Sequence, residues 1–347
     1  MANKLIVLLA GDRADLGFHE VRSLLKLHNV NFKISRLDSN YVEVTTSCAL
    51  EDVVRALSYS STVKSVIKEL KRIKYTDSIE DIIKSLKSIC WNFLEGRKFK
   101  VEVIKVGSFP RLPSSPIMAR LIGSAIVKYT NRMVKVDLKE PDVVVIVLIW
   151  RRGISIGYLI SVFRRGRFRL RTPKIRPFFH PSSLTPDVSL LLVNLALGEA
   201  RLKGTMLDPF CGSGSTLIEA ALRGFYSVGV DINRDMCRGA IANLKFFQLY
   251  ELADIVVGDA CMLPFRSEAF CHIATDPPYG RVSSTSGRDL LSLLNGFWSE
   301  GLRVIRRGGV IAYMHPGWLR AKTRGDKVGE IHVHGDLVRV VKLVVKP

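Results

Sequence analysis

Apolar and polar positions recur with helical and strand periods along the second half of the chain. From Pro186 onward, helices with an apolar stripe alternate with short apolar runs, which is typical of an α/β domain with a mostly parallel, doubly wound sheet. The predicted helices are 186–198, 215–223, 233–247 and 287–306, and the predicted strands are 205–208, 226–231, 253–257, 271–276, 309–314, 330–334 and 338–345. Only Gly335-Asp336 separates the last two strands, so we expect a hairpin that gives the sheet one antiparallel strand.

The first half has a different order of elements. Residues 1–75 read β-α-β-β-α-β, which fits a small ferredoxin-like module. The strands predicted there are 4–9, 31–36, 41–46 and 62–68, and the helices are about 18–28 and 50–60. A second α+β block has predicted helices at 78–93 and 116–129 and strands at 100–106, 134–137, 143–150 and 154–162. We therefore expect domains at 1–75 and 76–163, a linker at 164–178, and the α/β domain at 179–347.

Positive charge is concentrated in the first half of the chain. The net charge is +20, and residues 1–180 hold 33 Lys and Arg against 16 Asp and Glu, whereas residues 181–347 hold 19 against 16. This asymmetry indicates that the first half binds a polyanion; a merely basic, well-solvated surface is the alternative. An anionic membrane is a weaker rival, because no basic amphipathic helix with a large apolar face stands out. The segment 163–177 alone carries seven cations and two prolines, and these cations either are solvated or face phosphates.

Targeting signals and cysteine pairs are inconspicuous. The longest apolar run, 143–150, is too short to cross a bilayer. The apolar start of the chain is interrupted at once by Gly11-Asp12-Arg13, unlike a signal peptide, so we expect a cytoplasmic protein. The six cysteines include no Cys-x-x-Cys pair and are interpreted as reduced thiols, so we expect no metal site.

A Gly-rich turn, 208–214, lies between a predicted strand and a predicted helix. Glycines there let a ligand approach the backbone, and Asp231, at the end of the next strand, is placed to bind ribose hydroxyls. The turn begins with Asp208, which would repel a pyrophosphate and suits an ammonium group. Asp259 follows the third strand and is placed to accept from an adenine N6 amine, with the Ala260 N–H near N1; a loop cap is the alternative for Asp259 taken alone. These features favour S-adenosylmethionine over NAD as the cofactor.

The run Asp276-Pro277-Pro278-Tyr279 follows the fourth apolar strand of this domain. Open α/β sheets bind ligands at the carboxyl ends of their strands. Asp276 and the Pro277 carbonyl could each accept one N–H of an exocyclic amine, which would hold its lone pair toward an electrophile. Tyr279 could stack on the ring or line the pocket with its phenol, and we favour stacking. The alternative is a proline-rich turn with an Asp cap, which would not explain the adjacent cofactor motifs.

The motifs LDPFCGSGS, VGVDIN, GDA and DPPYG resemble those of amino-group S-adenosylmethionine methyltransferases. With the N-terminal half, the chain is similar to THUMP-domain RNA guanine-N2 methyltransferases, above all the archaeal tRNA (guanine-10 N2) enzymes. This resemblance implies a Rossmann-like methyltransferase sheet behind ferredoxin-like and THUMP domains, and a segment at 179–186 that closes over the methionine end of the cofactor. Val282 and a final hairpin without a His-Lys-Ser stretch depart from the family pattern on the acceptor side.

Together these arguments give three sets of candidate residues. The cofactor set is Ser183, Thr185, Asp208, Phe210, Gly212, Gly214, Ser215, Thr216, Asp231, Ile232, Asp259 and Ala260. The catalytic set is Asp276, Pro277, Pro278 and Tyr279. The RNA-binding set is Arg164, Arg165, Arg167, Arg169, Arg171, Lys174 and Arg281. Arg281 is a candidate for binding a phosphate or the guanine O6, and a plain surface arginine is the alternative.

The expected activity is methylation of the N2 amine of a tRNA guanosine, at guanosine 10, once or twice. The alternatives are a guanine-N2 methyltransferase for another tRNA position or for rRNA, a DNA amino-methyltransferase, and a non-catalytic RNA-binding subunit. Protein glutamine methylation is disfavoured, because such enzymes usually have Asn in place of Asp276 and need no such basic chain. The resemblance also implies tRNA as partner and allows a small zinc-binding activator protein.

Overall fold

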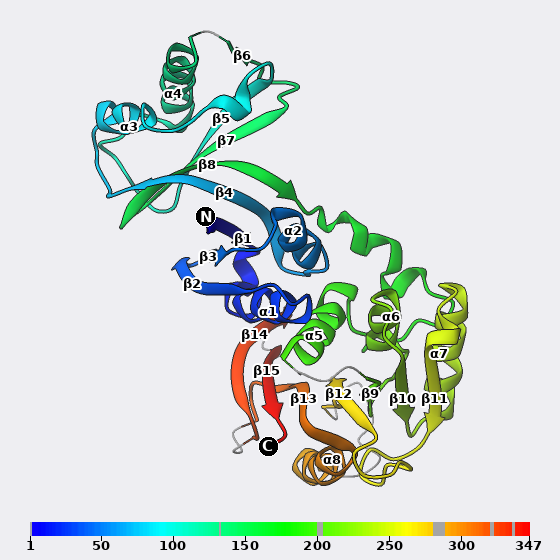
Figure 1. The fold of residues 1–347 in the computed structure, drawn as a ribbon. Helices are drawn as coiled ribbons and strands as arrows, with labels where there is room; N and C mark the ends of the chain where they lie inside the picture. Colours follow the sequence, from blue (N-terminus) through cyan, green and yellow to red (C-terminus); the bar gives the residue numbers. More distant parts are fainter. Residues whose placement is uncertain (1, 132, 200–203, 280–288, 320–322, 335–336) are drawn as a thin grey trace. The chain divides into compact units, whose positions relative to one another are not determined.

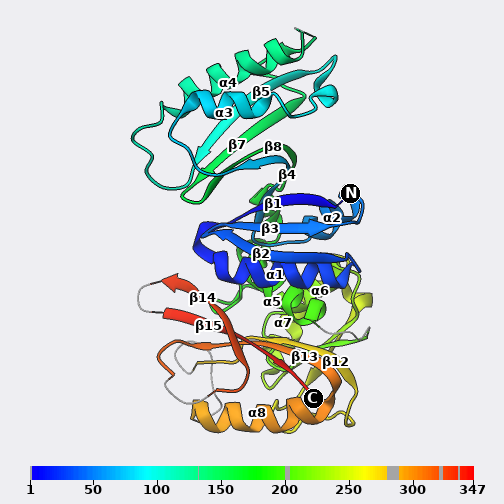
Figure 2. The same cartoon turned by 60° about the vertical axis from the view of Figure 1, so that its left-hand side comes forward.

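The computed structural model describes residues 2–131, 133–199, 204–279, 289–319, 323–334 and 337–347 (Figures 1 and 2). Contacts within the chain divide it into two compact units. Unit 1 comprises Met1–Leu9, Asn31–Val54 and Val63–Phe163, and unit 2 comprises Ala10–Val30, Arg55–Thr62 and Arg164–Pro347. In the described ranges, no helix combines the length and the apolar character that a membrane span requires.

Unit 1 is built around one eight-stranded sheet with the order β2-β3-β1-β4-β8-β7-β5-β6. Its strands are β1 (Asn3–Leu9), β2 (Phe32–Asp38), β3 (Tyr41–Thr46), β4 (Val63–Ile73), β5 (Lys98–Lys105), β6 (Lys135–Val136), β7 (Val143–Trp150) and β8 (Gly153–Val162). Its helices are α3 (Ile79–Leu86), η2 (Asn92–Leu94) and α4 (Ser115–Tyr129), and α2 (Leu50–Ser58) is shared with unit 2. The antiparallel order β2-β3-β1-β4 is that of a split β-α-β arrangement, as the sequence predicts.

A feature that the sequence does not predict is the continuity of this sheet. The strand predicted at 62–68 runs on to Ile73 as β4, and its second half pairs with β8. The buried carboxylate of Glu69 in this extension has hydrogen-bond donors on both strands. It accepts from Ser155 of β8 at 2.5 Å and from Arg72 of β4 at 2.7 Å. The helix predicted at 78–93 ends instead at Leu86, whose carbonyl accepts a hydrogen bond from the Trp91 indole at 3.1 Å.

Unit 2 contains a seven-stranded sheet with the order β11-β10-β9-β12-β13-β15-β14. Its strands are β9 (Met206–Asp208), β10 (Ser227–Asp231), β11 (Ala253–Val257), β12 (Phe270–Thr275), β13 (Ile305–Pro316), β14 (Asp326–His334) and β15 (Leu337–Val345). Its helices are α1 (Ala14–Leu27), α5 (Pro186–Glu199), α6 (Ser215–Leu222), α7 (Arg234–Phe246) and α8 (Leu290–Val304), with short 3-10 turns at η1 (Gly11–Arg13), η3 (Arg165–Arg171), η4 (Pro173–Ile175) and η5 (Tyr250–Leu252). The strands β9 to β13 are parallel, and β15 is antiparallel to both neighbours, so the predicted hairpin and mostly parallel sheet are confirmed.

Helix α5 explains why residues from the start of the chain belong to unit 2. Its sequence is apolar on nearly every side, and such a helix must be covered all round. The sheet covers one side, and α1 packs along another, with Leu16 completely buried in the shared core. The Glu20 carboxylate of α1 is also buried and accepts five hydrogen bonds, one of them from Asn194 of α5 at 2.7 Å. Helix α1 is therefore part of the folded core of unit 2.

Candidate active site

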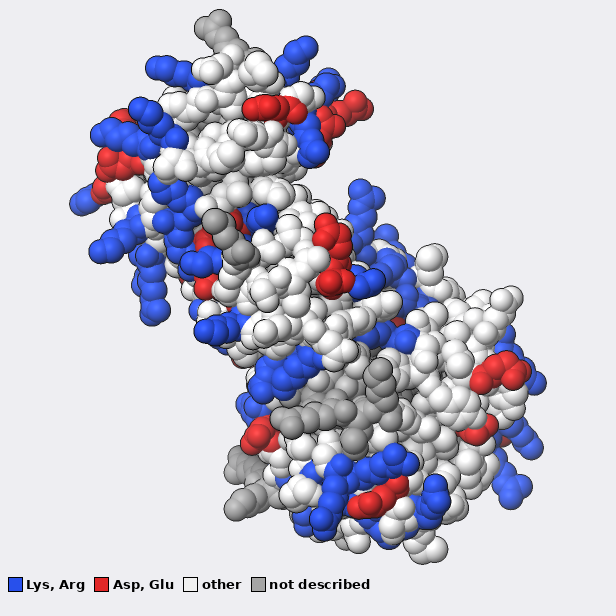
Figure 3. Space-filling model, viewed as in Figure 1, with Lys and Arg blue, Asp and Glu red and all other residues white. Residues whose placement is uncertain are grey.

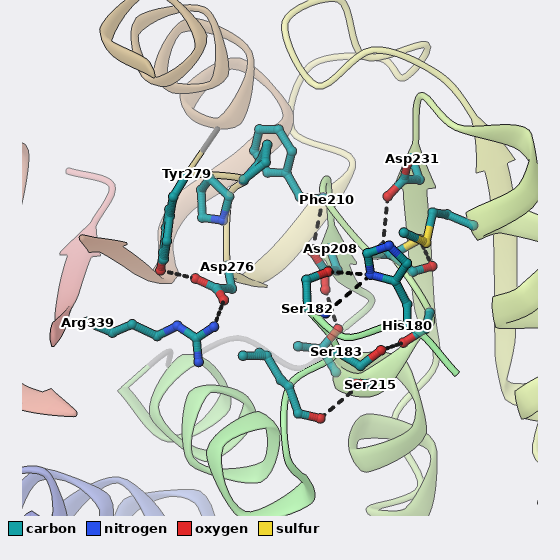
Figure 4. Close-up of a pocket in the computed structure, with 18 of the residues that line it drawn as sticks. His180, Ser182, Ser183, Asp208, Phe210, Ser215, Asp231, Asp276, Tyr279 and Arg339 are labelled. Carbon is teal, nitrogen blue, oxygen red and sulfur yellow. Dashed lines mark hydrogen bonds and ion pairs between the residues drawn. The ribbon is translucent and has the colours of Figure 1, made fainter. Parts of the chain in front are cut away.

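Strand β12 is buried throughout, and Asp276 follows its last residue, so Asp276 lies at the carboxyl edge of the sheet. Two side chains meet the Asp276 carboxylate there (Figure 4). The phenol of Tyr279 donates a hydrogen bond to Oδ1, and the guanidinium of Arg339, on β15, lies 3.5 Å from Oδ2. The same guanidinium lies 5.8 Å from the centre of the Tyr279 ring. The three side chains thus form one compact group on the wall of a cavity.

Burial controls the protonation of this group. Burial raises the pKa of Asp276, and the charge of Arg339 and the hydrogen bond from Tyr279 offset part of that rise. Burial and the neighbouring carboxylate raise the pKa of Tyr279 well above its ordinary value of 10.0. The phenol therefore keeps its proton near neutral pH and acts as a donor to Asp276, while Asp276 retains lone pairs for a further donor.

The Gly-rich turn after β9 has the backbone shape that glycine allows. Gly212 and Gly214 have φ values of +50° and +81°, a region in which other residues are strained. Asp231, at the end of β10, braces the turn by accepting a hydrogen bond from the Gly212 N–H at 2.9 Å. The other carboxylate oxygen accepts from the Asn233 N–H at 2.9 Å. The turn and the acid of the second strand are thus joined directly.

His180 lies beside Asp231, with its ring toward the carboxylate, and is not among the candidate residues predicted from the sequence (Figure 4). Its Nδ1 accepts a hydrogen bond from the Ser182 N–H at 3.3 Å, which assigns the ring proton of the neutral form to Nε2. Burial raises the pKa of Asp231, and the hydrogen bonds from the Asn233 and Gly212 N–H groups and, least, the proximity of His180 oppose the rise. His180 belongs to the segment that the family resemblance places over the cofactor.

Asp208 is more deeply buried than the sequence suggests. Its carboxylate accepts hydrogen bonds from Thr275 at 2.6 Å, from the Phe210 N–H at 3.1 Å and from the hydroxyl of Thr216. Burial raises its pKa to about 6, and these hydrogen bonds oppose the rise. Most of its acceptor capacity is therefore used within the protein, and direct binding of an ammonium group stays a prediction.

One cavity of about 1010 Å³ brings most of the predicted residues together. It is lined by all four candidate catalytic residues and by every candidate cofactor residue except Gly214. Gly214 faces α7 instead, where an added Cβ would come within 3.2 Å of Ala240. Arg281 lies outside the described residues. Arg13, Trp318 and Arg339 also line the cavity, although the sequence pattern does not predict it.

The basic segment after unit 1 is docked on unit 2 to a greater extent than a solvated linker would be. Arg171 donates to both carboxylate oxygens of buried Glu219, at 2.7 and 2.9 Å. Arg167 donates to the carbonyls of Ser58 and Ser60, and Arg165 lies 3.1 Å from Asp187. The remaining candidates in this segment, Arg164, Arg169 and Lys174, are exposed. The cations therefore divide into a group that binds the protein and a group that faces solvent.

Comparison with known proteins agrees with this architecture. Residues 76–158 match a family model described as THUMP domain, and residues 173–325 match one described as RMKL-like, methyltransferase domain. The chain therefore carries a THUMP domain and an RMKL-like methyltransferase domain, and the predicted resemblance and fold class are confirmed.

The chain is also similar to archaeal tRNA-modifying enzymes. It is 27% identical to the tRNA (guanine(10)-N2)-dimethyltransferase of Methanothermobacter thermautotrophicus, over 98% of this chain and 99% of that protein. It is also 27% identical to the enzyme of the same name from Methanocaldococcus jannaschii, over 97% of this chain and 98% of that protein. The crystal structure of TrmN from Thermus thermophilus shares the fold, with a TM-score of 0.58 and 22% identity over 99% of this chain and 100% of that chain.

Proposed function

We propose that this protein transfers a methyl group from S-adenosylmethionine to the exocyclic N2 amine of guanosine 10 in tRNA. The observation that carries the proposal is the single cavity in which Asp276-Pro277-Pro278-Tyr279 faces the Gly-rich turn and the strand-end acids. The names of the archaeal relatives support tRNA as the substrate and guanosine 10 as the target. The substrate in turn supports a cytoplasmic location.

The residues on one side of the cavity fit the cofactor. Asp208, Asp231 and Asp259 all line it, and such a concentration of carboxylates disfavours a ligand with phosphates. Asp231 uses one lone pair on each oxygen for backbone N–H groups, so each oxygen retains a lone pair for ribose hydroxyls. Ile232, which is 50% exposed, offers an apolar surface beside it for the adenine ring. When bound, S-adenosylmethionine supplies an electrophilic methyl group.

The other side of the cavity orients the acceptor. The N2 amine of guanine is a poor nucleophile, because its lone pair is delocalised into the ring. We propose that the Asp276 carboxylate and the Pro277 carbonyl each accept one N–H, which fixes the direction of the nitrogen lone pair. As the new N–C bond forms, the bond between the methyl group and the sulfonium sulfur breaks, S-adenosylhomocysteine leaves as a neutral thioether, and the nitrogen must lose one proton. Asp276, whose pKa is raised by burial, is the carboxylate placed to accept it.

Tyr279 makes a contact that the sequence does not predict. Its phenol already donates to Asp276, which holds both side chains in place before the substrate arrives. Its ring is also part of the cavity wall, so stacking on the guanine stays a prediction. Extracting the target base from its stack costs roughly a few kcal/mol, which stacking and phosphate contacts would offset.

Exposed cations are the proposed contacts to the tRNA backbone. Arg164, Arg169 and Lys174 face solvent on unit 2, and Figure 3 shows many Lys and Arg side chains over the visible face of unit 1. Such contacts recognise phosphates and shape and carry little sequence information. The choice of base must therefore come from contacts inside the cavity.

We also propose a small zinc-binding activator protein as a partner. Its support is the sheet of unit 2, in which β11, like β14, is one of the two edge strands among those described. Exposed apolar side chains lie in and after that strand, with Val257 50% and Met262 75% exposed. An outermost strand offers backbone groups to which a second protein can add a strand. An activator that binds there should raise turnover, and Val257→Lys should abolish the increase while leaving the activity of the isolated protein unchanged.

The test of the proposed function is to map the methylated nucleoside. Unmodified tRNA would be incubated with the protein and S-adenosylmethionine, digested with a base-specific nuclease and analysed by mass spectrometry. We expect N2-methylguanosine or N2,N2-dimethylguanosine at position 10. Methylation at another tRNA position or only in rRNA would replace the proposed target, and methylation of DNA alone would overturn the function.

A further inference from the structure

Arg339 is a single cation in the otherwise apolar strand segment Leu337-Val338-Arg339-Val340-Val341 of β15. Its side chain is only 15% exposed and lines the same cavity as Asp276. Its Nε is buried and has no hydrogen-bond partner among the described residues. A buried arginine with an unsatisfied N–H beside a substrate cavity is costly unless a ligand satisfies it.

The surroundings of Arg339 make a phosphate an unsuitable ligand. The guanidinium lies 3.5 Å from the Asp276 carboxylate, so the pair has little net charge with which to attract an anion. It also lies beside the Tyr279 ring, on the wall where we place the acceptor base. A neutral, flat group with its own donors and acceptors fits this pair better than a phosphate does.

The edge of guanine matches the pair atom by atom. It presents, in order, the O6 acceptor, the N1–H donor and the N2 amine donor. Asp276 offers acceptors and Arg339 offers donors, side by side. We propose that Asp276 accepts from the N2 amine and from N1–H, while Arg339 donates to O6, so that Arg339 selects guanine. This inference rests on the proposed function, and it assigns to Arg339 the O6 contact for which Arg281 is a candidate from the sequence.

The assignment predicts which analogue the enzyme rejects. 2,6-Diaminopurine keeps the 2-amino group but has an amine in place of O6 and an acceptor at N1. Its 6-amine would meet the donors of Arg339, and its N1 would meet a carboxylate acceptor. Hydrogen-bonding sites discriminate strongly against such mismatches, and a pair of contacts gives about tenfold to a hundredfold. For the wild-type protein, kcat/KM for the guanosine tRNA should therefore exceed kcat/KM for the 2,6-diaminopurine tRNA by at least about tenfold.

The experiment compares two synthetic tRNAs that carry guanosine or 2,6-diaminopurine riboside at the methylated position. Wild type, Arg339→Met and Arg339→Lys would be assayed on both, with Arg238→Met as a control that removes an exposed arginine of α7. We expect Arg339→Met to lose the part of the preference that comes from O6 and to keep the part that comes from the N1 mismatch with Asp276. Arg339→Lys should lose less of the preference than Arg339→Met, and Arg238→Met should keep all of it. If Arg339→Met does not fold, Arg339→Gln takes its place in the comparison.

Several results would overturn the inference. One is a wild-type protein that methylates both tRNAs equally well. Another is that Arg339→Met slows methylation of both tRNAs by the same factor. Arg339 would then only position Asp276 or contact the tRNA backbone, and it would not select the base. Failure of the wild type to methylate the guanosine tRNA would instead refute the proposed function itself. The two failures are therefore distinguishable in one set of assays.

Discussion

The ion pair between Arg171 and Glu219 tests whether the basic segment is docked on unit 2. The Glu219 side chain is 1% exposed and the Arg171 side chain 17% exposed, and two hydrogen bonds of 2.7 and 2.9 Å join them. Burial raises the pKa of Glu219, and Arg171 is the largest influence in the opposite direction. We therefore expect Arg171→Met to leave a buried, poorly compensated carboxylate.

The expected cost can be worked from this geometry. Removing one partner of a buried ion pair costs about 3–5 kcal/mol. Arg176 and Arg167 also act on Glu219 and remain in the variant, so we expect the lower end, about 3 kcal/mol. Without Arg171 the pKa of Glu219 in the folded state rises further above its ordinary value of 4.5. The folded protein then holds the proton more tightly than the unfolded chain does, so stability falls as pH rises through that range.

The assay is urea unfolding of the whole chain at about pH 8 and at about pH 4, because the proton-linked stability is fully present below the ordinary Glu219 pKa of 4.5 and falls as pH rises above it. Arg171→Met should lose stability mainly at the higher pH, and the double variant with Glu219→Gln should recover part of the loss. Arg169→Met, at an exposed neighbour, should change stability by less than about 0.5 kcal/mol. A loss in Arg171→Met no larger than in Arg169→Met, or the same loss at both pH values, would refute the reasoning.

Further predictions concern the cavity and the exposed cations. Tyr279→Phe removes the hydrogen bond that lowers the pKa of Asp276, so the acidic limb of the kcat–pH profile should move to higher pH. An acidic limb at the same pH as in wild type would show that this hydrogen bond does not affect Asp276 during catalysis. Asp231→Ala removes the hydrogen bond that Asp231 accepts from the Gly212 N–H and should raise the calorimetric Kd of S-adenosylmethionine at least about tenfold. A Kd within about twofold of wild type would exclude a role of Asp231 in cofactor binding. Arg169→Glu should weaken tRNA binding and flatten its salt dependence in filter-binding assays, whereas an unchanged salt slope would remove Arg169 from the interface.

The candidate site was predictable where its chemistry is contiguous in sequence. Short apolar runs mark strand ends, and Asp231 and Asp276 each follow such a run directly. Parallel strands bring their carboxyl ends to one edge, so these acids were expected to meet. The cavity contains both of them together with the Gly-rich turn.

The rest depends on which distant elements become neighbours. Arg339 reaches Asp276 because β15 inserts between β13 and β14, and local sequence does not encode that order. Its only signal was a cation at an apolar strand position. Helix α1 was expected in a separate module, but its contacts with α5 place it in unit 2. Likewise, Arg171 resembled a solvated cation because its partner, Glu219, lies 48 positions away.

Asp276 gives the most direct test of the central claim, which is that this carboxylate orients the amine that receives the methyl group. Asp276→Ala should lower single-turnover methylation of tRNA by at least about a hundredfold to a thousandfold, the effect of removing one preorganised transition-state contact. Binding of tRNA and of S-adenosylmethionine should stay within a few-fold of wild type, and the exposed-acid control Asp235→Ala should behave as wild type. Turnover of Asp276→Ala within a few-fold of wild type would contradict the account.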